Sequence, residues 1–207
     1  MVIKSIVVTS SISKEGKSTV AANLATVISQ LGRKVLLIDA DLRVPSQHHF
    51  WQITNSPGLS ELLVGQTEYT SSIAEVMDNL DVLTSGVRPP NPLTLLDSKR
   101  MAALIEEFSS QYDFVIIDTP PLLVGADAVT VSQMTDGILL VARPGVIDYN
   151  NAKTAKEMLN RSNYHVLGLL VNGIIQKNEP SNYFYSPEEY YSAPQSQTVT
   201  KKDRIKG

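Results

Sequence analysis

Apolar residues gather in short, nearly unbroken runs, and longer helix-like stretches separate these runs along the chain. Runs of this kind are typical of parallel strands that are covered on both faces. They predict strands over residues 5–10, 35–39, 80–85, 114–118, 137–142 and 166–172. The helix-like segments between them cover residues 17–31, 92–110, 126–133 and 151–161. Alternating strands and helices predict an α/β fold in which a mostly parallel sheet lies between two helix layers.

The composition changes after Gln176, where prolines are spaced through a segment rich in Ser, Asn, Gln and Glu. Such a composition is typical of a flexible tail. We therefore expect one domain over residues 1–177 and a tail over residues 178–207. The tail holds half of the eight tyrosines of the chain, namely Tyr183, Tyr185, Tyr190 and Tyr191.

The segment SSISKEGKST follows the first predicted strand and leads into a predicted helix, which is the context of a phosphate-binding loop (P-loop). Backbone N–H groups at a helix N-terminus favour a phosphate group. Lys17 would reach the β- and γ-phosphates, and the Ser18 hydroxyl would bind Mg²⁺. We expect nucleotide contacts at Ser13, Lys14, Glu15, Gly16, Lys17, Ser18 and Thr19.

This loop departs from the usual pattern, which has a glycine five residues before Gly16, where this chain has Ser11. Taken alone, Gly-Lys-Ser-Thr is equally consistent with the start of an ordinary helix. Lys14 would either add charge next to the phosphates or face solvent.

Carboxylates directly follow two predicted strands. Asp39 ends one strand with Asp41 just beyond it, and Asp118 ends another. Because ligands bind at the carboxyl ends of parallel strands, we expect these side chains beside Lys17. Each aspartate alone is equally consistent with a helix or turn cap. Together with the loop, the three aspartates predict a magnesium site at this edge, with Asp118 as the metal carboxylate of a Walker B strand.

Three other polar features bear on this site. Asp39 or Asp41 would accept a proton from a hydroxyl substrate. Arg43 is expected to bind a phosphate or to pair with an acidic partner, and a surface salt bridge is the structural alternative. Asn172, at the end of the last predicted strand, would contact the adenine base or serve as a turn residue.

The bulk composition excludes several classes of function. A formal net charge of −3 does not indicate a nucleic-acid-binding protein. The chain has no cysteine, which excludes disulfides and thiolate metal sites. Its longest apolar runs, VLLI and GILLVA, fall far short of the ~20 residues that span a bilayer.

Taken together, the motifs resemble the bacterial tyrosine kinases that regulate capsule and exopolysaccharide synthesis. SSISKEGKSTVAANLA resembles their Walker A motif, and LLIDADLRVPSQHHF resembles their Walker A′ motif. The segments SGVRPPNP and VIIDTPP and the tyrosine cluster continue the match over nearly the whole chain. The resemblance implies a P-loop NTPase-like fold with ATP and Mg²⁺ as cofactors. It also implies that Lys17 binds phosphates while Ser18, Asp39 and Asp118 organise Mg²⁺.

The resemblance further implies an ATP-dependent protein-tyrosine kinase that phosphorylates its own tail tyrosines. Implied partners are a transmembrane polysaccharide co-polymerase, fused or separate, a protein tyrosine phosphatase and further copies in a ring. Nucleic acid is not an implied partner, and the implied location is the cytoplasmic face of the plasma membrane. The ring-contact helix of the family precedes the first strand, where this chain begins, so we expect a fragment or weaker self-association.

Two other functions use the same motifs. Partitioning and septum-placement ATPases of the ParA and MinD type share the fold, but they carry a lysine where this chain has Ile12. A non-catalytic module that senses ATP and steadies a membrane partner is the second alternative.

Overall fold

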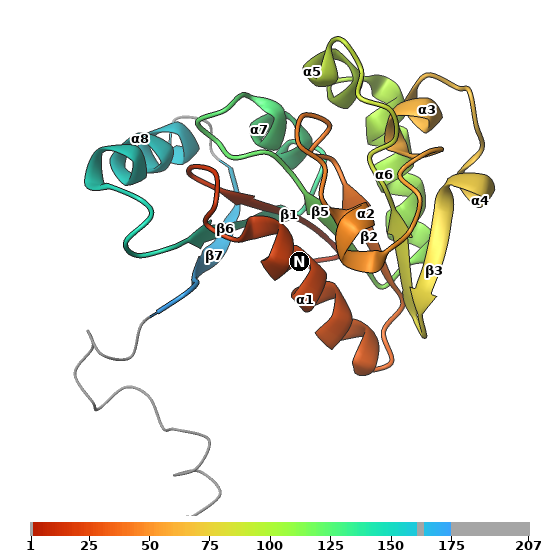
Figure 1. The fold of residues 1–207 in the computed structure, drawn as a ribbon, viewed down its shortest axis with the longest axis horizontal. Helices are drawn as coiled ribbons and strands as arrows, with labels where there is room; N and C mark the ends of the chain where they lie inside the picture. The colour runs from red at the N-terminus through yellow and green to blue at the C-terminus, as the bar shows by residue number, and fades with distance from the viewer. Residues whose placement is uncertain (1, 161–163, 175–207) are drawn as a thin grey trace, which may run out of the picture. The chain divides into compact units, whose positions relative to one another are not determined.

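A seven-stranded sheet forms the centre of this computed structural model, which describes residues 2–160 and 164–174 (Figure 1). Its order is β3-β4-β2-β5-β1-β6-β7, and every neighbouring pair is parallel except β3 with β4. The strands are β1 (Ser5–Ser10), β2 (Val35–Asp39), β3 (Ile73–Met77), β4 (Leu80–Leu83), β5 (Phe114–Asp118), β6 (Gly137–Ala142) and β7 (Val166–Val171).

Helices cover both faces of the sheet (Figure 1). Successive residues of β1 point to opposite faces, because Val7 packs in one buried cluster and Val8 in the other. The fold class predicted from the sequence is confirmed. The helices are α1 (Lys17–Gln30), α2 (Gln47–Trp51), α3 (Leu59–Leu63), α4 (Tyr69–Ser72), α5 (Pro92–Leu96), α6 (Lys99–Gln111), α7 (Asp127–Ser132) and α8 (Tyr149–Asn160).

Two helices show how the layers are built. α1 places Ala21, Ala22 and Ala25 against the sheet, and these small side chains let the helix that carries the phosphate loop pack close to β1 and β2. α6 buries Met101, Leu104, Ile105 and Phe108 on the opposite face, with the i, i+3, i+4, i+7 spacing of an amphipathic helix.

The predicted elements agree with the structure at most positions. The predicted bounds of β1, β2, β5 and β6 are correct, and those of β4 and β7 are one or two residues too long. The single helix predicted over residues 92–110 is wrong, because α5 ends at Leu96 and the Ser98 hydroxyl accepts a hydrogen bond from the backbone of Met101 at 3.1 Å to begin α6. The sequence pattern also missed β3 and the short helices α2, α3 and α4.

The residues up to Gly173 form one compact unit. The predicted boundary after residue 177 lies outside the described residues, as do the tail and its four tyrosines. Among the described residues no helix has both the length and the apolar character needed to cross a bilayer.

Candidate active site

The carboxyl ends of β1, β2 and β5 meet at one edge of the sheet, beside the loop that leads into α1. Asp39 is the register partner of Asp118 across the β2–β5 pair. The two aspartates are separated by 79 positions in the sequence, but the sheet places their backbones side by side. The prediction that these strand ends converge near the phosphate loop is therefore confirmed.

Lys17 connects the loop to two of the carboxylates. Its Nζ lies 3.0 Å from Asp41 Oδ2 and 3.4 Å from Asp118 Oδ1, and it donates to Ser18 Oγ at 2.9 Å. Burial lowers the pKa of Lys17, but the charges of Asp118 and Asp41 outweigh this effect and leave the pKa above its ordinary value. Lys17 is therefore a firmly charged ammonium group among acidic side chains.

Asp39 is held by backbone N–H groups. Its Oδ2 accepts hydrogen bonds from the N–H groups of Ser46 and Gln47, both at 2.9 Å, and its Oδ1 accepts one from the N–H of Asp41 at 3.2 Å. The side chain is fully buried. Burial, together with the neighbouring charge of Asp118, raises the pKa of Asp39 to about 7.

Asp118 is also fully buried, and its two oxygens have different partners. Oδ1 faces the Lys17 ammonium, while Oδ2 accepts a hydrogen bond from Gln47 Nε2 at 2.8 Å. Burial raises the pKa of Asp118, and the positive charge of Lys17 and the hydrogen bond from Gln47 act against this rise. Removal of Lys17 would leave this buried carboxylate without its compensating charge.

The charges at this edge fit a divalent cation with a phosphate ligand. The three carboxylates of Asp39, Asp41 and Asp118 face one ammonium group, so negative charge is in excess in a region shielded from water. Within the described residues, no three acidic or histidine side chains are grouped so as to hold a metal by themselves. Mg²⁺ suits such a site, because it binds through one or two carboxylates and takes its other ligands from phosphates and water.

The phosphate loop is braced from inside the protein by Glu15. Its buried carboxylate accepts hydrogen bonds from the N–H of Ile12 at 2.7 Å and from the N–H of Arg143 at 3.2 Å. The carboxylate is therefore engaged with the protein, and the group of Glu15 that remains suited to a phosphate is its backbone N–H. Ser13, Lys14 and Thr19, which were also predicted to contact the nucleotide, are exposed around this brace.

Asn172 holds the same loop from the end of β7. Its Nδ2 donates to the backbone carbonyl of Glu15 at 2.9 Å. Gly16 lies directly against this amide, because a Cβ added to Gly16 would stand 2.2 Å from Asn172 Nδ2. Gly16 also adopts a φ of +91°, in the left-handed region that favours glycine. The positive φ by itself favours glycine at this position, and a larger residue would also displace the Asn172 amide.

Arg43 pairs with a partner that the sequence pattern did not identify. Its Nε lies 3.1 Å from Asp127 Oδ1, and its Nη2 donates to Asp127 Oδ2 at 3.1 Å. The Asp127 side chain is completely buried, whereas that of Arg43 is 31% exposed. Of the alternatives for Arg43, the structure shows pairing with an acidic partner, and this bidentate pair joins the segment after β2 to the start of α7.

Gln47 and Asp127 are the site residues that sequence reasoning missed. Gln47 lies in PSQHH, where no apolar pattern predicts that a side chain is buried. Asp127 lies near the start of a predicted helix, where an aspartate is common. Both are fully buried in the structure. Gln47 lies near the end of the segment that resembles Walker A′, but its partner and that of Arg43 are 71 and 84 positions away in the sequence, so the contacts themselves have no local signal.

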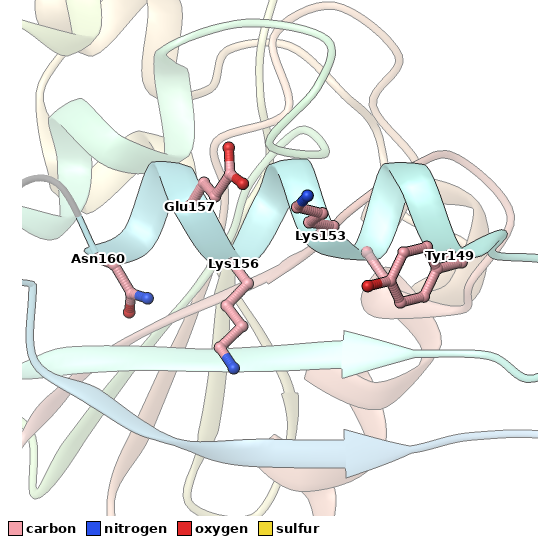
Figure 2. Close-up of a pocket in the computed structure, with 6 residues that line it drawn as sticks. Tyr149, Lys153, Lys156, Glu157 and Asn160 are labelled. Atoms are coloured by element: carbon pink, nitrogen blue, oxygen red, sulfur yellow. The ribbon is translucent and has the colours of Figure 1, made fainter.

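A cavity of about 450 Å³ lies along α8, separate from the site residues. Figure 2 shows the labelled side chains of this cavity, all of which come from α8. Tyr149 is one of them and is 79% exposed. Tyr112, in contrast, is buried and donates to Asp81 Oδ2 at 2.7 Å.

Known proteins resemble this chain in both sequence and fold. A family model described as ParA, NUBPL iron-transfer P-loop NTPase, matches residues 1–185. The tyrosine-protein kinase YwqD of Bacillus subtilis is 42% identical over 91% of this chain and 80% of its own length. The putative tyrosine-protein kinase CapB of Staphylococcus aureus is 38% identical over 90% of this chain and 82% of its own length.

A solved structure agrees with these relatives. The kinase domain of the Escherichia coli tyrosine kinase ETK is 37% identical, with a TM-score of 0.80 over 88% of this chain and 72% of that one. The septum-site protein MinD of Pyrococcus horikoshii, at 24% identity and a TM-score of 0.68 over 81% of this chain and 69% of that one, shares the fold alone. The absence of cysteine leaves no thiolate to hold an iron–sulfur cluster.

The Walker A and Walker A′ segments converge in space as the sequence resemblance implied, and close relatives are matched over most of their length. The chain therefore has a ParA-like P-loop NTPase fold and belongs to the bacterial tyrosine-protein kinase family.

Proposed function

We propose that this chain transfers the γ-phosphoryl group of ATP to the hydroxyl groups of its own tail tyrosines. The observation that carries the proposal is the convergence of Lys17, Asp41 and Asp118 within hydrogen-bonding distance beside a phosphate loop. Phosphoryl transfer needs little covalent chemistry from the protein, because positioning and charge stabilisation supply most of the rate. This edge of the sheet offers both.

Each residue of the site has a separate task in this proposal. The N–H groups of the loop and the Lys17 ammonium bind the phosphates. The Ser18 hydroxyl and the carboxylates of Asp39 and Asp118 would hold Mg²⁺, which neutralises charge on the phosphates when it is bound. The Asn172 amide keeps the loop in shape through the Glu15 carbonyl.

Asp41 is the better candidate of the two aspartates to assist the attacking tyrosine. All three hydrogen bonds to Asp39 come from backbone N–H groups, which fixes its carboxylate as part of the framework. Asp41 has its Oδ1 on the N–H of Val44 at 2.9 Å and its Oδ2 on Lys17. A nucleotide that draws Lys17 onto its phosphates would release Asp41 Oδ2 to accept the proton of a tyrosine hydroxyl.

The phosphate acceptors in this proposal are Tyr183, Tyr185, Tyr190 and Tyr191. Each added phosphate brings about −1.5 to −2 charges, so phosphorylation of several neighbouring tyrosines makes the tail strongly anionic and drives neighbouring tails apart. A tail that enters the site of a second copy in a ring, and a phosphatase that reverses the reaction, belong to the same proposal.

The biological setting is also part of the proposal. The chain spans 24% of the length of the Escherichia coli tyrosine-protein kinase Etk, so relatives of very different total length carry this domain. We place the chain at the cytoplasmic face of the plasma membrane, held by a fused or separate transmembrane co-polymerase, in the control of capsule or exopolysaccharide synthesis and export.

The decisive experiment compares Lys17→Met with the parent chain after incubation with Mg²⁺ and ATP, with tail phosphotyrosine mapped by mass spectrometry. We expect phosphotyrosine to fall at least about a hundredfold, because the cation that faces the phosphates is lost. Lys153→Met is the matched control, since Lys153 is exposed on α8 and lies outside the site.

The same experiment separates the alternatives. ATP hydrolysis by the parent chain without any phosphotyrosine would favour a ParA- or MinD-type ATPase. Nucleotide binding with neither hydrolysis nor phosphotransfer would favour the non-catalytic ATP-sensing module. Phosphate that appears only on serine would contradict the proposed acceptors.

A further inference from the structure

Gln47, the first residue of α2, stands where three segments of the site meet. Its Nε2 donates to Asp118 Oδ2 at 2.8 Å and to the backbone carbonyl of Ser18 at 3.0 Å. Its backbone N–H donates to Asp39 Oδ2 at 2.9 Å. One residue therefore contacts the end of β2, the end of β5 and the first turn of α1, and it is completely buried while doing so.

The chemistry of these contacts fixes the orientation of the Gln47 amide. Both groups around Nε2 are acceptors, a carboxylate oxygen of Asp118 and a carbonyl oxygen of Ser18, so the NH₂ group must face them. Both of its hydrogens are used, and the carboxylate bond is charge-assisted. The opposite orientation would place three oxygens against one another without a proton between them.

The other end of the same amide is unsatisfied. Gln47 Oε1 is buried and has no hydrogen-bond partner among the described residues. A buried carbonyl oxygen without a partner destabilises a fold, because it has lost its bonds to water. Space filling alone therefore does not explain an amide at this position, whereas the two donors of its NH₂ group do.

The surrounding segment has the same character. Of the described residues, those with a buried side-chain nitrogen or oxygen that lacks a partner all lie between positions 46 and 51, namely Ser46, Gln47, His48 and Trp51. Asp39 and Asp118, whose carboxylate oxygens have hydrogen-bond partners, are thus held by a segment that itself contains unpaired buried polar atoms. Such a local conflict is expected where a segment serves the site more than the stability of the fold.

We propose that Gln47 is a positioning residue for the magnesium site, which holds Asp118 and the Ser18 turn in the relative placement that the metal requires. The inference rests on the proposed nucleotide-dependent function. With Oδ2 of Asp118 held by Gln47, its Oδ1 is the oxygen directed at Lys17 and the phosphate loop. Loss of a group that orients a metal-binding side chain commonly lowers metal affinity 10- to 100-fold.

Gln47→Met tests this role, because methionine has nearly the same length and shape but neither donor. The measurement is the affinity for ADP by calorimetry, once with Mg²⁺ and once in EDTA, together with the melting temperature of the nucleotide-free chain. We expect the Mg²⁺-dependent affinity to fall about tenfold and the affinity in EDTA to change less than about twofold. The melting temperature should fall by no more than about 5 °C, because Asp118 and Ser18 each lose one hydrogen bond while the unpaired Oε1 is removed.

Trp51→Phe is the matched control. It removes another unpaired buried polar atom from the same helix, and the Trp51 side chain forms no hydrogen bond to Asp39, Asp118 or Ser18. It should leave the affinity for ADP unchanged with and without Mg²⁺.

Three results would overturn the role of Gln47. These are equal losses of affinity with and without Mg²⁺, an unchanged affinity in both conditions, and a Gln47→Met chain that melts well below the parent or fails to fold. Failure of the parent chain itself to bind ADP more tightly with Mg²⁺ would instead contradict the proposed function, so the two failures can be told apart.

Discussion

The strands β2 and β7 show how differently the centre and the flank of this sheet are built. Every residue of β2 is buried, and the strand pairs with β4 on one side and β5 on the other. In β7 every residue is exposed or half-buried, and Leu169 is 59% exposed. Within the described part of the chain this strand pairs with β6 alone.

This difference matches the distribution of charged groups in the site. β2 and β5 end in fully buried aspartates, whereas the end of β7 provides a neutral amide, Asn172. A buried charge demands fixed partners, and backbone N–H groups can be fixed only where neighbouring segments hold the chain from several sides. The charged side chains of the site therefore lie at the buried centre of the sheet, and the flank contributes only the neutral amide of Asn172.

The largest effect on the free energy of unfolding is expected from a matched pair of leucine truncations, one in each strand. Leu36→Ala in β2 should lower the free energy of unfolding by about 3 kcal/mol, because it leaves a cavity in a completely buried cluster. Leu169→Ala in β7 should lower it by less than about 0.5 kcal/mol, because that side chain is mostly in solvent. Urea denaturation measures both, and similar losses would show that the flank is as tightly packed as the centre.

A smaller effect is expected from the charge on Asp39. Its pKa is about 7 in the folded chain, against ~3.9 in an unfolded one. Between these values the folded chain keeps the proton and the unfolded chain does not, so the contribution of Asp39 to the free energy of unfolding falls as the pH rises toward 7. Above that pH a charged carboxylate must be held beside Asp118 and Asp41, with Lys17 as the compensating cation.

Asp39→Asn should remove this dependence. The difference in the free energy of unfolding between the variant and the parent chain should be more favourable to the variant at pH 8 than at pH 5.5. The expected change is on the order of 2 kcal/mol, because between pH 5.5 and about 7 only the folded parent chain holds the proton on Asp39. Urea denaturation of the nucleotide-free chain in EDTA at the two pH values gives the comparison. An equal gain at both values would mean that Asp39 titrates in the same way in the folded and unfolded chains.

The smallest effect concerns the contribution of the flank to the site. Asn172→Ala removes the hydrogen bond to the Glu15 carbonyl, which we expect to weaken ADP binding about fivefold, or about 1 kcal/mol. Calorimetry with Mg²⁺ present measures this loss. Asn160→Ala, at an exposed position on α8, is the control, and a loss of a hundredfold for Asn172→Ala would give the flank the same importance as the centre.

Much of the site could be read from the sequence because its elements are local. A strand that runs into Gly-Lys-Ser and a helix predicts a phosphate loop by spacing alone, and the unbroken apolar runs before Asp39 and Asp118 predict two buried parallel strands. Parallel strands all present their carboxyl ends to one edge, so the convergence of these residues followed without knowledge of the strand order.

The remainder of the site depends on side-chain partners that are distant in the sequence. Nothing in PSQHH indicates that Gln47 is buried, and nothing near Arg43 indicates that its partner is Asp127. Polar residues in a run of this kind are mostly exposed in proteins. Their burial follows from the packing of α2 and α7 against the rest of the domain, which periodicity cannot predict.

The sequence by itself determined the class of fold, the phosphate loop and the strand-end aspartates, because each depends on the order and polarity of neighbouring residues. The tertiary structure alone decided that Asp39 stands beside Asp118, that Gln47 joins both to Ser18, and that Asn172 fixes Gly16 in the loop. Apart from the contact between Gln47 and Asp39, which are 8 positions apart, these contacts join residues that lie 29 to 157 positions apart. Their geometry comes from the strand order and the packing of the helices on the sheet, and no local pattern records either.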